Sequence, residues 1–132
     1  LKMVLVCGPR VSASSLNVPR GVEVREYVPA LYRHFAACDL AVVQGGGASV
    51  LELAALKRPF LYFPLQGHSE QMLHISKMLE GSGVGRKMIY HNTTPRSLAR
   101  AIVSSLGKKV DYPPLPLNGA ATAAGLISNC FR

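Results

Sequence analysis

The sequence predicts an α/β fold, a Rossmann-like parallel sheet with flanking helices. Short runs of β-branched and aromatic apolar residues alternate with longer segments of helical periodicity, and turn residues separate them. Residues 40–43 and 60–63 are apolar throughout instead of alternating, which is typical of strands covered on both faces of a parallel sheet. The 132 residues have the length of one domain, and no run approaches the ~20 apolar residues that a membrane helix needs.

The periodicity places each element in order along the chain. Strands are expected at 2–7, 22–28, 40–44, 60–63 and 87–90. Helices are expected at 30–38, 48–57, 70–80, 95–106 and 119–129. Thr94 and Pro95 predict the start of the fourth helix, and Gly107 predicts its end. Residues 1–132 are expected to form one domain that is part of a longer chain, and residues 108–118 are expected to be an extended connector to its C-terminal helix.

Composition restricts the partners and the compartment. Fifteen Lys and Arg against seven Asp and Glu give a net charge of +8, which favours anionic partners. The basic residues are dispersed and accompany no aromatic platform, so we expect no nucleic-acid binding, whereas peripheral contact with an anionic membrane stays open. The sequence has three distant cysteines, which predict neither a disulfide framework nor a zinc site: Cys7, Cys38 and Cys130. No signal peptide is evident either, so the expected location is cytoplasmic.

A glycine turn is the most informative segment. The predicted strand 40–44 runs into Gly45, Gly46 and Gly47 and then directly into a helix. Glycines permit positive φ and close approach of a ligand, and a helix start offers unpaired N–H groups, so the segment predicts a phosphate site. Ser49 adds a hydroxyl, and Glu52 could accept from sugar hydroxyls. The alternative is a tight structural turn with Ser49 as a helix cap and Glu52 in solvent.

A second polar cluster follows the strand 60–63. His68, Glu70 and Gln71 lie where the carboxyl end of this strand should adjoin the glycine turn, and ligands of open α/β sheets bind at that edge. Glu70 and Gln71 suit sugar hydroxyls, and His68 could face a phosphate. The alternative is a helix start with Ser69 as cap and a Glu70–His74 pair. Zinc bound by His68, Glu70 and His74 matches no H-E-x-x-H pattern, and we expect no metal.

Together these segments resemble the C-terminal, nucleotide-sugar-binding domain of GT-B glycosyltransferases. The likeness covers about residues 22–106 and is closest to the group of the UDP-glucuronosyl/glucosyltransferases and the bacterial lipid-linked GlcNAc transferase. Tyr27-Val28-Pro29 resembles the aromatic-x-Pro loop of the family, which implies that Tyr27 and Val28 hold the base. The apolar strand after Asp39 is also similar to the stretch that precedes the family's glycine turn.

The two polar segments carry the rest of the resemblance. Gly46, Ser49 and Glu52 fall on the family's G-x-x-[ST]-x-x-E element, and the final [DE]-Q of its P-x4-P element falls on Glu70 and Gln71. The resemblance implies that Glu52 binds the ribose and that Glu70 and Gln71 bind the donor sugar. It also implies a diphosphate site formed by Gly46, Gly47, Ala48 and Ser49. Gln44 departs from the family, because plant members have a phosphate-contacting histidine there, and we expect His68 or a basic side chain to supply that charge instead.

The implied function is that of the donor-binding part of a glycosyltransferase, which moves a sugar from a UDP-sugar to a hydroxyl acceptor. The family's N-terminal acceptor domain, which usually carries the catalytic base, has no counterpart here, so the chain is expected to be inactive without it, in cis or in trans. No cofactor beyond the UDP-sugar substrate is expected. Two alternatives stay open: a fragment of an enzyme of the UDP-GlcNAc 2-epimerase type, and a non-catalytic nucleotide-sugar-binding subunit that pairs with a separate acceptor-domain chain.

Overall fold

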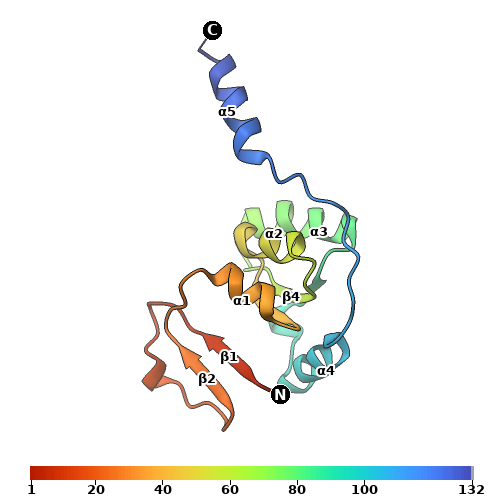
Figure 1. Ribbon diagram of the computed structural model, residues 1–132. Helices are drawn as coiled ribbons and strands as arrows, with labels where there is room; N and C mark the ends of the chain where they lie inside the picture. The colour runs from red at the N-terminus through yellow and green to blue at the C-terminus, as the bar shows by residue number, and fades with distance from the viewer. Residues whose placement is uncertain (132) are drawn as a thin grey trace. The chain divides into compact units, whose positions relative to one another are not determined.

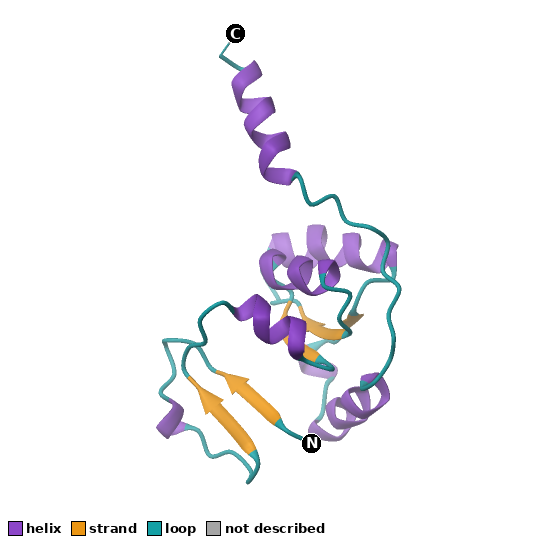
Figure 2. Ribbon diagram, viewed as in Figure 1, coloured by secondary structure: helices purple, strands orange, loops and turns teal. Residues whose placement is uncertain are grey.

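The computed structural model describes residues 1–131 and contains helices and parallel strands that form two compact units, one comprising Leu1–His34 and the other beginning at Phe35 (Figures 1 and 2). The predicted α/β class is confirmed, and the strands are divided between two sheets. No helix in the described part is both long and apolar enough to cross a bilayer. The elements are, in order, β1 (Met3–Val6), η1 (Ala13–Ser15), β2 (Val22–Arg25), α1 (Leu31–Ala37), β3 (Ala41–Gln44), α2 (Gly47–Ala55), β4 (Phe60–Phe63), η2 (Glu70–Ile75), α3 (Ser76–Ser82), β5 (Arg86–Lys87), η3 (Tyr90–Asn92), α4 (Pro95–Ser105) and α5 (Gly119–Asn129).

The first unit contains a two-stranded parallel sheet. β1 pairs with β2 in the register Met3↔Val22 to Val6↔Arg25. The connection contains the short 3-10 turn η1, where the N–H of Ala13 donates to Glu26 Oε1 at 2.9 Å. All four residues of β1 are exposed although all four are apolar. The sheet therefore has little core of its own, because the apolar faces of β1 remain uncovered within the described residues.

The second unit holds most of the core around the three-stranded parallel sheet β3-β4-β5. β4 is its centre, and Phe60, Leu61 and Tyr62 are almost fully buried, as the uninterrupted apolar run predicts. In Figure 1, α2 and α3 lie on one side of β4 and α4 lies on the other. The helices contribute buried residues to this core: Val50, Leu53, Ala54, Leu79 and Ala101.

Local signals set the ends of several elements. Thr94 caps α4 by accepting from the N–H of Ser97 at 3.1 Å, with Pro95 in the first turn, as predicted. Gly107 follows α4 with φ +70°, which confirms it as the stop signal. α3 ends at Gly83 in the left-handed conformation, and the N–H of Val84 returns to Leu79 O at 3.0 Å.

Several predicted boundaries were wrong. The strand expected at 22–28 ends at Arg25, because its partner β1 ends at Val6. The strand expected at 87–90 is Arg86–Lys87, and Tyr90 begins the 3-10 turn η3 instead. The helix expected from residue 30 begins at Leu31, since Ala30 has φ +50°.

Candidate functional site

The glycine turn follows the carboxyl end of β3 and lies beside the end of β4. Gln44 pairs with Phe63, and the N–H of Gly45 donates to Phe63 O at 3.0 Å. A Cβ added to Gly45 would lie 3.0 Å from Pro64 Cα, so a side chain there would push against the backbone of the neighbouring segment. The first glycine is therefore explained by close packing between two strand ends.

Gly46 is the N-cap of α2, with φ −72° and ψ 138°. The glycine turn does not use the positive φ that glycine permits, since Gly45, Gly46 and Gly47 all avoid that region. Because any residue can adopt such φ values, the available space, and not the backbone torsion, explains why glycine stands here. A Cβ at Gly46 would meet nothing within 4 Å, so the approach to the helix start is open.

The first turn of α2 presents main-chain donors to this open space. The first helical bond runs from Val50 N to Gly46 O at 3.3 Å. The N–H groups of Gly47, Ala48 and Ser49 precede it and have no partner within the helix, and they carry the positive end of the helix dipole. Such a helix start can bind an anion.

Ser49 and Glu52 both lie on α2, one turn apart. The alternative in which Ser49 caps the helix is wrong, because the cap is Gly46 and no side chain caps the helix. The Ser49 side chain is half-buried in the first turn, and Glu52 is exposed. Both side chains are thus on the element that bears the main-chain donors.

The second polar segment, residues 64–71, is held by a side chain of its own. The Oε1 of Gln71 accepts from the N–H of Leu65 at 3.0 Å, and Gln71 is buried. Its amide nitrogen is left to donate elsewhere. His68 is exposed, and its N–H donates to Leu65 O at 3.2 Å. Gln71 therefore shapes the loop that precedes it, a role that its polar character alone did not predict.

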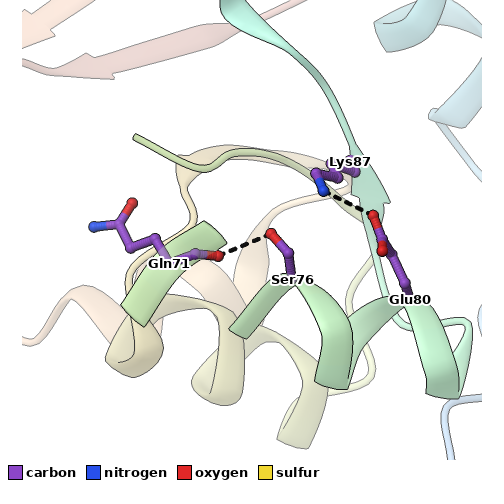
Figure 3. Close-up of polar contacts among 4 residues, drawn as sticks. All are labelled: Gln71, Ser76, Glu80 and Lys87. Atoms are coloured by element: carbon purple, nitrogen blue, oxygen red, sulfur yellow. Dashed lines mark hydrogen bonds and ion pairs between the residues drawn. The ribbon is translucent and has the colours of Figure 1, made fainter. Parts of the chain in front are cut away.

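The predicted α-helix at 70–80 begins instead with the π-helical turn η2. Ser76 Oγ donates to the main-chain oxygen of Gln71 at 2.8 Å, five residues back, and the Ser76 N–H bonds the same oxygen (Figure 3). These bonds span five residues instead of the four of an α-helix, so the turn contains one additional residue. Such π-turns occur frequently at functional sites. Burial, supplemented by the Glu80 carboxylate, raises the pKa of the Tyr62 phenol. Glu80 itself pairs with Lys87 at 2.9 Å.

The alternative structural role of this helix start is not supported. Ser69 makes no cap hydrogen bond, and its φ and ψ are already helical. Glu70 and His74 form no ion pair, although both are within the described part of the chain. Within residues 1–131, no three His, Cys, Asp or Glu side chains gather as a metal site would require.

The structure brings the two polar segments together at one point. A Cβ on Gly47 would lie 3.8 Å from Glu70 Oε1 and 3.5 Å from Ile75 Cδ1. The Glu70 carboxylate therefore faces the first turn of α2, where the helix dipole favours a negative charge. No contact places His68 against the glycine turn, so its contact with a diphosphate stays a prediction.

Tyr27 and Val28 lie in the first compact unit, whereas the glycine turn lies in the second. Tyr27 is 74% exposed, and its ring is therefore available for stacking, while Val28 is buried. Their contact with a base stays a prediction. The hydrogen bond of Ser76 to the Gln71 carbonyl, which holds the π-turn beside this segment, was not predicted, and the spacing of five residues is the signal that could have indicated it.

Comparison with known proteins agrees with this arrangement. The family model of the glycosyltransferase family 28 C-terminal domain matches residues 1–121. The chain belongs to this family. This family 28 domain is 30% identical over 103 residues to an uncharacterized glycosyltransferase of Methanosarcina acetivorans, covering 77% of the chain and 27% of the relative. The resemblance to a GT-B C-terminal domain inferred from the sequence is thereby confirmed.

Two further comparisons place the family 28 domain among transferases. A UDP-N-acetylglucosamine–N-acetylmuramyl-(pentapeptide) pyrophosphoryl-undecaprenol N-acetylglucosamine transferase of Clostridioides difficile is 29% identical over 102 residues, or 74% of this chain and 24% of that protein. The crystal structure of the glycotransferase of kitacinnamycin matches with a TM-score of 0.67 and 25% identity, covering 81% of this chain and 27% of that one. The domain spans about a quarter of the length of the curated relatives it matches.

Proposed function

We propose that this domain binds the nucleotide sugar in a glycosyltransferase and that the donor is a UDP-sugar. The observation that carries the proposal is the open helix start of α2, where the N–H groups of Gly47, Ala48 and Ser49 precede the first helical bond. Membership of the glycosyltransferase family 28 supports it, and a relative bears UDP-N-acetylglucosamine in its name.

In the proposed reaction, the bond between the anomeric carbon of the sugar and the diphosphate oxygen breaks, and a bond to the acceptor oxygen forms. The acceptor proton goes to a base that we place in an N-terminal acceptor domain, in cis or in trans. The diphosphate leaves with growing negative charge, and the oriented N–H groups of Gly46, Gly47, Ala48 and Ser49 stabilise it. Glu52 is proposed to accept hydrogen bonds from the ribose hydroxyls. Glu70 is proposed to accept from the hydroxyls of the donor sugar, and the Gln71 amide to exchange hydrogen bonds with them.

The setting that fits this proposal is the cytoplasm, with peripheral contact to an anionic membrane. The C. difficile relative acts, by its name, on a pyrophosphoryl-undecaprenol acceptor, and the net charge of +8 favours anionic surfaces.

The test is UDP titration calorimetry on Ser49→Ala in the full-length protein, with Ser128→Ala in α5 as a chemically matched control. One lost hydrogen bond to a charged phosphate predicts that Ser49→Ala weakens UDP binding by about tenfold or more. Ser128→Ala should bind like wild type, and both variants should keep the melting temperature. Wild-type affinity in Ser49→Ala would contradict the proposed diphosphate site.

A further inference from the structure

Basic pairs gather at the edge of the second sheet that lies opposite the glycine turn. Lys57-Arg58 precedes β4, Arg86-Lys87 forms β5, and Lys108-Lys109 follows α4. β3, β4 and β5 are parallel, so their amino ends lie at one edge. Ser104, near the end of α4, accepts from Arg86 at 3.2 Å, which brings the end of that helix to the same edge. Residues that are dispersed in the sequence are thus collected by the topology.

Two of these pairs line a cavity of about 370 Å³, together with one carboxylate: Asp39, Lys57, Arg58, Lys108 and Lys109. Lys57 also approaches Asp111 at 3.4 Å, but their side chains are 57% and 97% exposed, and such exposed pairs contribute little. Four cations and the Asp39 carboxylate therefore line the cavity, and the exposed Asp111 lies beside Lys57. The third pair does not line the cavity, and its side chains already have partners, since Lys87 bonds Glu80 and Arg86 bonds Ser104.

The backbone of Lys57, one of the residues that line this cavity, has an unusual conformation for a lysine. Lys57 has φ +51° and follows the end of α2, where the N–H of Arg58 bonds Leu53 O at 3.0 Å and the N–H of Lys57 bonds Ala54 O at 3.0 Å. This is the position at which helices usually carry glycine, because other residues are strained there. Lys57 therefore lines the cavity in a backbone conformation that favours glycine.

We propose that this cavity is a second anion site that binds a phosphate group, carried either by a small soluble ion or by a lipid headgroup. The half-buried Arg58 offers a planar fork that can bind two phosphate oxygens, and the three lysines supply point charges around it. The site is separate from the glycine turn, which lies at the other end of the same strands, about 13 Å away for a four-residue strand. The inference does not depend on the donor-binding proposal.

The first experiment uses nuclear magnetic resonance on the full-length protein with UDP in excess, so that any phosphate site at the glycine turn is already occupied. Inorganic phosphate should then shift the amide signals of Gly107, Lys108 and Lys109. The variant Lys108→Ala/Lys109→Ala should weaken phosphate binding by about tenfold or more. A charge-matched control, Arg96→Ala/Arg100→Ala on the exposed face of α4, should change it by less than about twofold.

The variant Lys57→Gly tests whether a loss of phosphate binding could result from misfolding. It removes a cation and relieves the positive φ, so the melting temperature should rise while phosphate affinity falls by about threefold or more. Unchanged UDP affinity in all three variants separates this site from the donor site. A failure of UDP to bind at all would contradict only the proposed function, because the phosphate shifts at residues 107–109 do not require it.

Co-sedimentation with phosphatidylcholine vesicles, with and without phosphatidylglycerol, identifies the source of the phosphate. Loss of phosphatidylglycerol-dependent binding in the Lys108/Lys109 variant alone assigns the site to lipid headgroups. Vesicle binding that ignores the variant, together with phosphate shifts that respond to it, assigns the site to a soluble phosphate. No shift at residues 107–109, or equal losses in the α4 control, overturns the proposal in favour of diffuse surface charge.

Discussion

Two neighbouring strands of one sheet are connected to the helices that follow them in different ways. β3 passes into α2 through Gly45 and Gly46, and no side chain caps the helix. β4 passes into η2 through residues 64–69, and that segment is held by the Gln71 side chain on the N–H of Leu65. The first junction presents main-chain N–H groups, whereas the second presents side chains.

The difference teaches what each junction requires of its sequence. A site made of backbone donors depends on space and on helix geometry, so its glycines are needed only where a side chain would collide or block access. A site made of side chains depends on the groups that hold its loop. Substitutions at the two junctions should therefore destabilise the protein for different reasons: overpacking at the junction of β3 and α2, and lost hydrogen bonds at the junction of β4 and η2.

The largest loss of stability is expected at the glycine that packs against a backbone. Gly45→Ala places a methyl 3.0 Å from Pro64 Cα, and overpacking of this kind costs about 1–3 kcal/mol of unfolding free energy. Gly47→Ala is the matched control, since its methyl would lie 3.5 Å from Ile75 Cδ1 in ordinary contact and inside a helix. Urea denaturation should show the first variant destabilised and the second at least as stable as wild type; equal midpoints would show that the β3–β4 ends are not tightly packed.

A smaller loss is expected at the second junction. Gln71→Met keeps the size of the side chain and removes the acceptor for the N–H of Leu65, which predicts a loss of about 1 kcal/mol. Gln44→Met, at the exposed end of β3, is the control for adding an apolar side chain. Under the proposed function, calorimetric titration should also show that Gln71→Met lowers the affinity for a UDP-sugar more than the affinity for UDP. Wild-type stability in Gln71→Met would mean that the loop is held by other contacts.

The same comparison explains which features the sequence could predict. The start of α4 was predictable because Thr94, Pro95 and Ser97 are adjacent and cap the helix among themselves. The residue types at the candidate site were predictable too, because they follow the ends of apolar strands.

The features that were missed depend on partners distant in the chain. β5 pairs only Arg86 and Lys87 with β4, which no local pattern in residues 86–90 reveals. The π-turn depends on the Ser76 hydroxyl reaching the Gln71 carbonyl, and local propensity does not distinguish that turn from an α-helix. The packing reason for Gly45 could not be predicted locally, because the collision with Pro64 exists only once β3 and β4 are paired.

The smallest change in stability is expected at Gly46, where a side chain would disturb no packing but would block access to the helix start. A methyl there meets nothing within 4 Å, and φ −72° suits alanine, so Gly46→Ala should cost no more than about 0.5 kcal/mol through its weaker capping. The same methyl would occupy the space in front of the α2 donors, so UDP affinity should fall by about tenfold or more if a diphosphate binds there. Gly119→Ala, at the first residue of α5 and equally uncrowded, should leave both quantities near wild type. A Gly46→Ala variant that binds UDP as wild type does would place the diphosphate elsewhere, since a ligand held by these N–H groups cannot share that space with a side chain.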